Sequence, residues 1–133
     1  MSKKILIIED ESIMLNLLKR KLVGDGYDVF VARDGEEGLG KMREVHPDLV
    51  LLDIVMPKMG GIEVLENAQK DKEIKRIPVI IISNSGQPVE IDKARHLGAR
   101  DWLVKTEFDP QEVSDKIIKL IGKGEKAKKE SDL

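Results

Sequence analysis

The chain has 133 residues, of which 41% are hydrophobic and 36% are charged, and its formal net charge at pH 7 is −2. This length and balance are typical of one globular domain, and so small a net charge does not favour direct binding to nucleic acid or to an anionic membrane. The absence of cysteine excludes disulfides, thiolate chemistry and cysteine-ligated metals.

Five short aliphatic runs alternate with longer amphipathic stretches along the chain. The runs are too short for helices, far below the roughly 20 residues of a membrane span, and most lack alternating polar residues. Such runs are typical of strands buried on both faces of a parallel sheet. Residues 1–4 lead directly into the first run and do not resemble a signal peptide, so we expect the cytoplasm. The expected strands are Ile5 to Ile8, Val29 to Ala32, Leu49 to Leu52, Val79 to Ile82 and Trp102 to Val104.

The segments between these runs carry signals for helix ends. Asp34 with Glu37, and Asp109 with Glu112, have the spacing of a capping box, and Pro110 stands at the favoured first position of a helix. Three glycines follow apolar periodic stretches, where helices are expected to end: Gly24, Gly98 and Gly122.

This order of elements predicts an α/β fold with right-handed crossovers. We expect a flavodoxin-like (βα)5 architecture, a doubly wound five-stranded parallel sheet with strand order 2-1-3-4-5. The domain is predicted to occupy residues 1–121. Residues 122–133 have almost nothing to bury and are predicted to form a charged flexible tail or linker.

Three of the expected helices have apolar patterns or glycines that bear on their packing and stability. The first, at about residues 12–23, spreads its apolar side chains over an arc of roughly 200°, about twice what a core-facing stripe needs. The excess indicates either tight packing or a surface for a partner. The second contains Gly38 and Gly40, each costing about 1 kcal/mol relative to alanine, and is expected to be weakly held. The fourth has apolar residues scattered around its axis and is expected to be marginal.

Acidic, hydroxyl and basic side chains follow four of the expected strands. In a sheet wound in this way, ligands bind at the carboxyl ends of the strands, near the switch point between strands 1 and 3. The sequence places residues 9–11, Glu-Asp-Glu, after the first strand, Asp53 after the third, Ser83 after the fourth and Lys105 after the fifth. Their joint placement predicts one site, although each residue alone would be commonplace in a loop.

Each of these side chains has a chemical role in phosphoryl transfer. Clustered carboxylates repel unless a cation neutralises them, and Mg²⁺ suits this cluster, with Asp10 and Asp53 as ligands and Glu9 binding directly or through water. Lys105 offers a compact positive charge to a phosphoryl oxygen, and Ser83 offers a hydroxyl hydrogen bond. An aspartate carboxylate is an accepted nucleophile for this reaction.

Three segments resemble motifs of the response-regulator receiver domain family of two-component signalling. Residues 49–61, LVLLDIVMPKMGG, resemble its phosphoacceptor segment. Residues 5–11, ILIIEDE, resemble its acidic strand end, and residues 98–105, GARDWLVK, resemble the approach to its lysine. The resemblance extends over about residues 3–121 with mutually consistent spacing.

The resemblance implies a phosphorylated switch. Asp53 would accept a phosphoryl group from a sensor histidine kinase, a phosphotransfer protein or a small acyl phosphate, with Mg²⁺ held by Asp10, Asp53 and the backbone carbonyl of Val55. Ser83 and Trp102 occupy the family's switch positions. A downstream effector or output domain would read the surface of the fourth helix, fifth strand and fifth helix. Such a domain catalyses its own phosphorylation and dephosphorylation but is not an enzyme with an independent turnover substrate, and whether phosphorylation drives dimerisation is open.

The sequence departs from the family pattern beside the site. Thr106 follows Lys105 where proline is usual, and a trans bond is expected because a cis bond without proline costs about 3 kcal/mol. The direction in which the Lys105 side chain points is therefore left open. Val55 and Asn84 flank the expected site, and we hypothesise slow self-dephosphorylation because the Val55 side chain cannot hydrogen-bond an attacking water.

Other functions fit the residues less well. A phosphorylation-independent protein-binding module of the same fold is the main alternative, but such modules typically lose the acidic pair, the acceptor or the lysine. A haloacid-dehalogenase-type enzyme would carry a second acid at the position of Val55. A flavin carrier would have a first loop rich in serine and threonine. Within the phosphorylated switch, the wide apolar arc of the first helix is interpreted as a kinase-docking surface.

Overall fold

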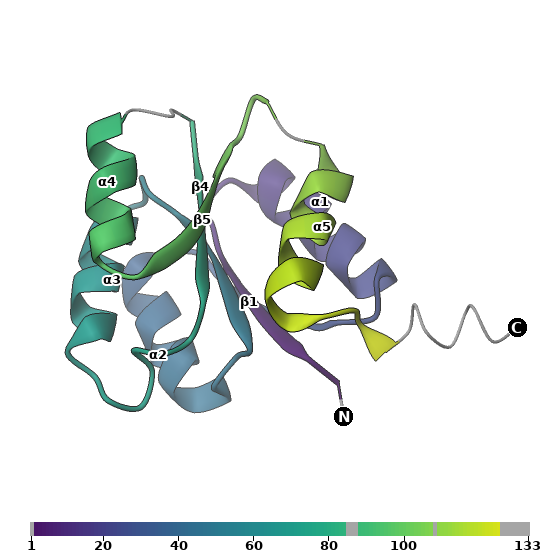
Figure 1. Cartoon of the computed structure of the whole chain (residues 1–133), viewed down its shortest axis with the longest axis horizontal. Helices are drawn as coiled ribbons and strands as arrows, with labels where there is room; N and C mark the ends of the chain where they lie inside the picture. The colour runs from purple at the N-terminus through teal and green to yellow at the C-terminus, as the bar shows by residue number, and fades with distance from the viewer. Residues whose placement is uncertain (1, 85–87, 108, 126–133) are drawn as a thin grey trace, which may run out of the picture.

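A computed structural model of the protein describes residues 2–84, 88–107 and 109–125, and Figure 1 shows its arrangement. One parallel sheet has the strand order β2-β1-β3-β4-β5, which confirms the predicted flavodoxin-like fold. The strands are β1 (Lys4–Ile8), β2 (Asp28–Ala32), β3 (Leu49–Asp53), β4 (Val79–Ser83) and β5 (Ala99–Val104). The helices that alternate with them are α1 (Ser12–Gly24), α2 (Gly35–Val45), α3 (Gly61–Gln69), α4 (Pro88–His96) and α5 (Pro110–Ile121).

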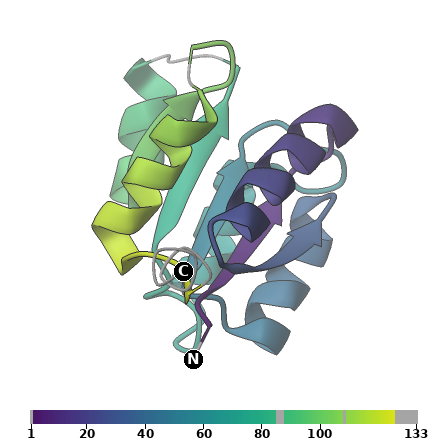
Figure 2. The same cartoon turned by 90° about the vertical axis from the view of Figure 1, so that its right-hand side faces the viewer.

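Helices cover both faces of the sheet. Helices α1 and α5 lie on one face, which Figure 2 turns toward the viewer, and α2, α3 and α4 lie on the other. In β1, the side chains of Ile5 and Ile7 pack toward α1 and α5, whereas those of Leu6 and Ile8 pack toward the opposite layer. All four are fully buried, and this two-sided burial explains why the strand has no polar alternation.

The predicted caps of α2 and α5 are confirmed. The side chain of Asp34 accepts a hydrogen bond from the backbone N–H of Glu37 at 2.8 Å. Asp109 accepts one from the N–H of Glu112 at 2.9 Å, and Pro110 is the first residue of α5. These bonds satisfy backbone donors that a helix leaves unpaired in its first turn.

The helix ends agree with the predicted glycines in two cases out of three. Gly98 follows α4 with a φ of 102°, and Gly122 follows α5 with a φ of 87°, a region that glycine enters without strain. Helix α1 instead includes Gly24, and the positive φ of 94° falls at Gly26. The N–H groups of Asp25 and Gly26 continue to bond to carbonyls of the last turn, which carries the helix past Gly24.

The two glycines of α2 have different surroundings. A Cβ at Gly38 would lie 2.5 Å from Cδ1 of Ile8, so the helix approaches the sheet more closely than alanine would allow. Gly40 is exposed and has open space around it. Glycine at position 38 lowers the helix propensity of α2 but allows the helix to pack closely against β1. The expected weakness of α2 remains a prediction.

Helix α4 agrees with its scattered apolar pattern. Among its side chains that the structure describes, only that of Ala94 is fully buried. Its marginal stability also remains a prediction. In the described parts of the chain, no helix combines the length and the apolar character needed to cross a membrane.

Contacts continue for four residues beyond the predicted end of the domain at residue 121. The hydroxyl of Tyr27 donates to the Gly122 carbonyl at 2.7 Å, and the Lys3 ammonium donates to the carbonyl of residue 123 at 2.9 Å. Gly124 is buried, and the N–H of residue 125 donates to the Gly26 carbonyl at 3.2 Å. Residues 122–125 thus lie against the start of β1 and the turn before β2. The rest of the predicted tail, residues 126–133, lies outside the described residues.

Candidate functional site

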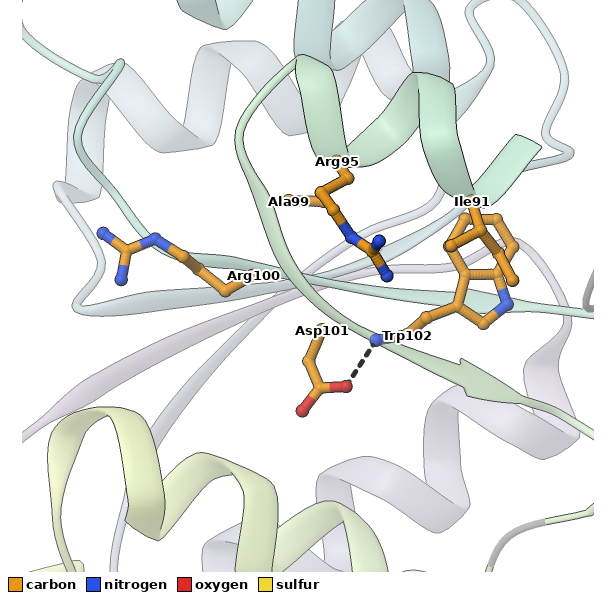
Figure 3. Close-up of a pocket in the computed structure, with 6 residues that line it drawn as sticks. All are labelled: Ile91, Arg95, Ala99, Arg100, Asp101 and Trp102. Carbon is orange, nitrogen blue, oxygen red and sulfur yellow. Dashed lines mark hydrogen bonds between the residues drawn. The ribbon is translucent and has the colours of Figure 1, made fainter. Parts of the chain in front are cut away.

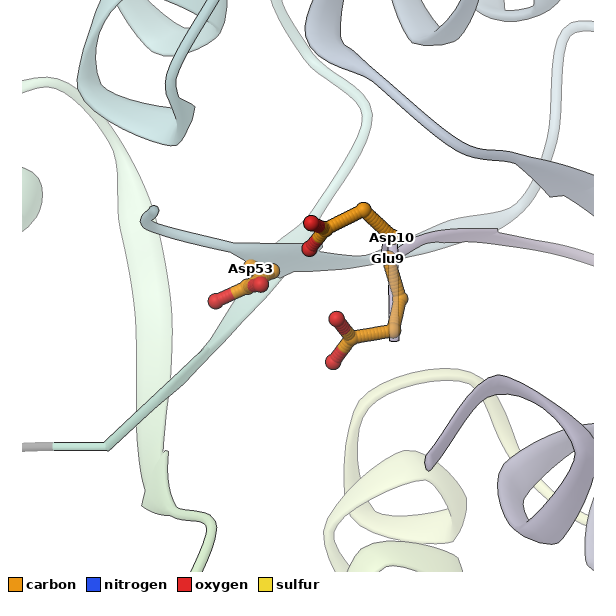
Figure 4. Close-up of side chains that lie close together, drawn as sticks. All are labelled: Glu9, Asp10 and Asp53. Atoms are coloured by element: carbon orange, nitrogen blue, oxygen red, sulfur yellow. The ribbon is translucent and has the colours of Figure 1, made fainter. Parts of the chain in front are cut away.

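Three of the predicted acidic residues meet at the carboxyl ends of β1 and β3. The two strands are neighbours in the sheet, with Ile8 opposite Leu52, so Glu9 follows beside Asp53. Figure 4 shows the side chains of Glu9, Asp10 and Asp53 close together, and one oxygen of each lies within 4.8 Å of the others. Glu9 and Asp53 are buried, whereas Asp10 is more accessible to solvent.

Lys105 completes the cluster from the end of β5. Its Nζ lies 2.7 Å from Oε1 of Glu9, 3.2 Å from Oδ2 of Asp53 and 2.8 Å from Oε1 of Glu11. Only 4% of the lysine side chain is exposed. The ammonium is therefore held among three carboxylates at the carboxyl ends of the strands.

A backbone hydrogen bond explains why Lys105 still points toward the acidic cluster although Thr106 follows it. The N–H of Lys105 donates to the Ser83 carbonyl at 2.7 Å, which ties the end of β5 to the end of β4. No peptide bond in the described residues is cis, as predicted for the bond before Thr106. The Lys105 side chain therefore points inward, toward Asp53, which settles the direction that the sequence left open.

Burial and like charge oppose ionisation of Asp53. Burial, and after it the neighbouring Glu9, raise the pKa of the Asp53 carboxyl, the nearby Lys105 lowers it, and the net result is a pKa of about 7. Burial alone would lower the pKa of the Lys105 ammonium, but its contacts with Glu11, Glu9 and Asp53 outweigh burial and raise that pKa. The acidic cluster thus holds more negative charge than Lys105 offsets, which favours binding of a further cation.

Ser83 and Trp102 lie on neighbouring strands. Ser83 is buried at the end of β4 and is paired in register with Val104. Trp102 is partly buried and packs against the core layer beneath α2, α3 and α4. Its indole Nε1 is buried without a hydrogen-bond partner among the described residues. Figure 3 shows Trp102 beside Ile91 in a pocket between α4 and β5.

The loop after β3 folds tightly behind Asp53. The N–H of Gly61 donates to the Ile54 carbonyl at 2.8 Å, and a Cβ at Gly61 would lie 2.4 Å from the carbonyl oxygen of Asp53. Glycine therefore allows α3 to begin directly behind the carboxylate. Val55 donates its N–H to Oδ1 of Asp53 at 3.4 Å, and its side chain is 71% exposed.

Glu11 is the site residue to which the sequence analysis gave no role. It was recognised as part of the acidic strand end, but nothing in the spacing showed that its side chain bends back to Lys105. Its carboxylate is 55% exposed, unlike those of Glu9 and Asp53. The position directly after an acidic pair was the only available signal.

A buried aspartate that lies in a carboxylate cluster and contacts a buried lysine is suited to phosphoryl-transfer chemistry. The site also lies at the switch point of a doubly wound sheet, where this fold binds its ligands. A family model described as the response regulator receiver domain matches residues 5–118. The chain therefore belongs to the receiver domain family of two-component response regulators.

Curated relatives support this membership. The alkaline phosphatase synthesis transcriptional regulatory protein PhoP of Bacillus subtilis is 35% identical over 133 residues, which are 100% of this chain and 54% of that protein. The probable transcriptional regulator ycf27 of Cyanophora paradoxa is 37% identical over 123 residues, 92% of this chain and 50% of that protein. The chain thus spans about half the length of these relatives.

Solved structures show the same fold. Chemotaxis protein CheY4 of Vibrio cholerae has a TM-score of 0.85 at 26% identity, covering 91% of this chain and 100% of that chain. A CheX–CheY–BeF3–Mg complex from Borrelia burgdorferi has a TM-score of 0.81 at 30% identity, covering 88% of this chain and 87% of that chain. The chain is accordingly a signalling domain, and the phosphorylation-independent alternative is not favoured.

Proposed function

We propose that Asp53 is the phosphoacceptor of this domain and that the domain catalyses its own phosphorylation and dephosphorylation. The observation that carries the proposal is the contact between the buried Asp53 carboxylate and Lys105 Nζ, at 3.2 Å, beside two further carboxylates. The phosphodonor is a sensor histidine kinase, a phosphotransfer protein or a small acyl phosphate.

The donor set fits Mg²⁺. Oxygens from three carboxylates lie within 4.8 Å of one another, and hard oxygen ligands are what this ion prefers. We propose that Asp10, Asp53 and the Val55 carbonyl hold it, with Glu9 binding directly or through water. When bound, the ion neutralises the carboxylates and the phosphoryl oxygens.

The residues of the chain would act as follows. An Asp53 oxygen attacks the phosphorus as the bond from phosphorus to the leaving group of the donor breaks. Lys105 pairs with one phosphoryl oxygen, and Ser83 donates its hydroxyl hydrogen to another. Hydrolysis reverses the modification when water attacks the phosphorus and the bond from phosphorus to the Asp53 oxygen breaks, which restores the carboxylate and releases inorganic phosphate. The apolar Val55 side chain offers that water no hydrogen bond, so the phosphorylated state is proposed to decay slowly.

The first experiment is incubation with acetyl phosphate, with and without Mg²⁺, followed by intact mass measurement. The wild-type chain is expected to gain the mass of one phosphoryl group only with Mg²⁺, and Asp53→Asn is expected to gain none. The fluorescence of Trp102, the single tryptophan, should change with the adduct if it is a switch residue. An unmodified, folded wild-type protein would support the phosphorylation-independent binding module instead.

We propose that the kinase or phosphotransfer protein docks on the exposed apolar side of α1. Leu15, Leu18 and Leu22 are buried against the sheet, so they account for packing. Three other apolar side chains of the helix remain largely accessible: Ile13 at 87%, Leu17 at 43% and Val23 at 44%. Ile13 stands in the first turn, two residues from Glu11 at the site. A downstream effector or output domain is proposed to read the α4, β5 and α5 surface.

Ile13→Lys tests the docking proposal. Phosphotransfer from purified histidine kinases that modify the wild-type chain is expected to slow by about tenfold or more, because a charge replaces an exposed apolar contact. Phosphorylation by acetyl phosphate should be unchanged, since Ile13 contributes no group to the cluster. Equal kinase rates for both proteins would contradict the assignment of this surface.

A further inference from the structure

The ammonium of Lys105 is enclosed by three carboxylates: it donates hydrogen bonds to Glu11 and Asp53 and forms an ion pair with Glu9. Lysine carries three N–H bonds and no acceptor, and Nζ of Lys105 lies within 3.2 Å of three carboxylate oxygens. Glu9, Glu11 and Asp53 each supply one of them. A phosphoryl oxygen that binds Lys105 therefore competes with these carboxylates for the ammonium, and Glu11 and Asp53 hold its two hydrogen bonds.

The three carboxylates differ in how easily they can leave. The side chains of Glu9 and Asp53 are 2% and 4% exposed and belong to the ends of strands in the sheet. Glu9 is held further because its Oε2 accepts the backbone N–H of Glu11 at 3.1 Å. The Glu11 side chain is 55% exposed, so water can solvate its carboxylate as soon as it leaves Lys105.

We propose that Glu11 is a displaceable counter-ion of Lys105, which occupies the contact that a phosphoryl oxygen needs and so lowers the affinity of the domain for a phosphoryl group. This inference rests on the proposed function of Asp53 and Lys105. A phosphoryl group brings up to two negative charges to the site and repels the Glu11 carboxylate as well as competing with it. Glu11 is thus a positioning residue that holds Lys105 in the unmodified state.

Glu11→Gln keeps the size of the side chain and removes its charge. Because an exposed ion pair contributes little by itself and the repulsion is partly screened, we expect beryllofluoride, a phosphoryl analogue, to bind about threefold to tenfold more tightly to this variant. The affinity for Mg²⁺ alone should not rise, since the variant removes a negative charge near the cation. A merely structural defect would weaken both ligands together.

The test is isothermal titration calorimetry of beryllofluoride at saturating Mg²⁺, with Mg²⁺ alone titrated separately. Glu36→Gln is the charge-matched control, because Glu36 is exposed in the first turn of α2 and has no contact with Lys105. Tighter beryllofluoride binding by Glu11→Gln alone supports the inference. Unchanged or weaker binding, or an equal gain in Glu36→Gln, overturns it. Failure of the wild-type and both variants to bind would contradict the proposed function, and this inference with it.

Discussion

Asp53→Asn is expected to stabilise the metal-free protein at pH 8, by about 2–4 kcal/mol in the free energy of unfolding. Burial, and after it Glu9, raise the pKa of the Asp53 carboxyl to about 7 despite Lys105. Above that pH the folded protein must hold an ionised carboxylate in an environment that opposes its charge. Asparagine has nearly the same shape and no charge, so it removes this cost.

The sign of the pH dependence follows from the two pKa values of Asp53. An aspartate in an unfolded chain titrates near pH 4, whereas Asp53 in the folded protein titrates at about 7. Between these values the folded state binds the proton more tightly, so the contribution of Asp53 to stability is lost as pH rises from about 4 to about 7. The advantage of Asp53→Asn should therefore be near zero at pH 4 and complete above pH 8.

Urea unfolding at a series of pH values measures this difference. Asp28→Asn serves as the control, because Asp28 is exposed on β2, away from the cluster, and its substitution should change stability little at any pH. Added Mg²⁺ should reduce the gap between wild type and Asp53→Asn by stabilising the wild type. A variant no more stable than wild type at pH 8 would show that the ionised Asp53 carries no such cost.

The sequence was sufficient to predict the sheet because its inner strands are buried on both faces. Unbroken runs such as residues 49–52 and 79–82 have few other structural explanations, and the right-handed crossover rule then restricts the winding. The start of β5, one of the two edge strands, was predicted less well. Strand β5 begins at Ala99, not at Trp102, because Arg100 and Asp101 interrupt the apolar pattern on an edge that is partly open to solvent.

The same distinction holds at the site. Strand ends determined where Glu9, Asp10 and Asp53 stand, so their proximity could be predicted from the topology alone. The direction of a long side chain over a loop depends on its rotamer and on its neighbours, which spacing does not reveal. The contact of Glu11 with Lys105 is of this kind. The roles of Ser83, Trp102 and Val55 in catalysis and switching remain predictions.

Lys105→Met is expected to have the opposite effect on stability to Asp53→Asn. The substitution keeps a long apolar stem and removes the ammonium that contacts both Glu9 and Asp53. Removing one partner of a buried ion pair is strongly destabilising, but here a proton can replace the lost cation, so we expect a loss of about 2–3 kcal/mol at pH 8. At pH 5 the loss should be smaller, because Asp53 is already protonated there.

A double-mutant cycle shows whether the two effects have one cause. In the Asp53→Asn background, Lys105→Met should cost clearly less than it does in the wild type, because one of the two buried carboxylates is already neutral. Phosphorylation of the single variant Lys105→Met by acetyl phosphate should slow by about 100-fold, since the charge that stabilises the phosphoryl oxygens is gone. Unfolding curves at pH 5 and pH 8 and a mass-based time course measure the two effects. Equal stability losses in both backgrounds would mean that Lys105 stabilises the fold through its packing. A smaller loss in the Asp53→Asn background would show that Lys105 stabilises the fold by offsetting the negative charge of Asp53, the residue that phosphorylation would modify.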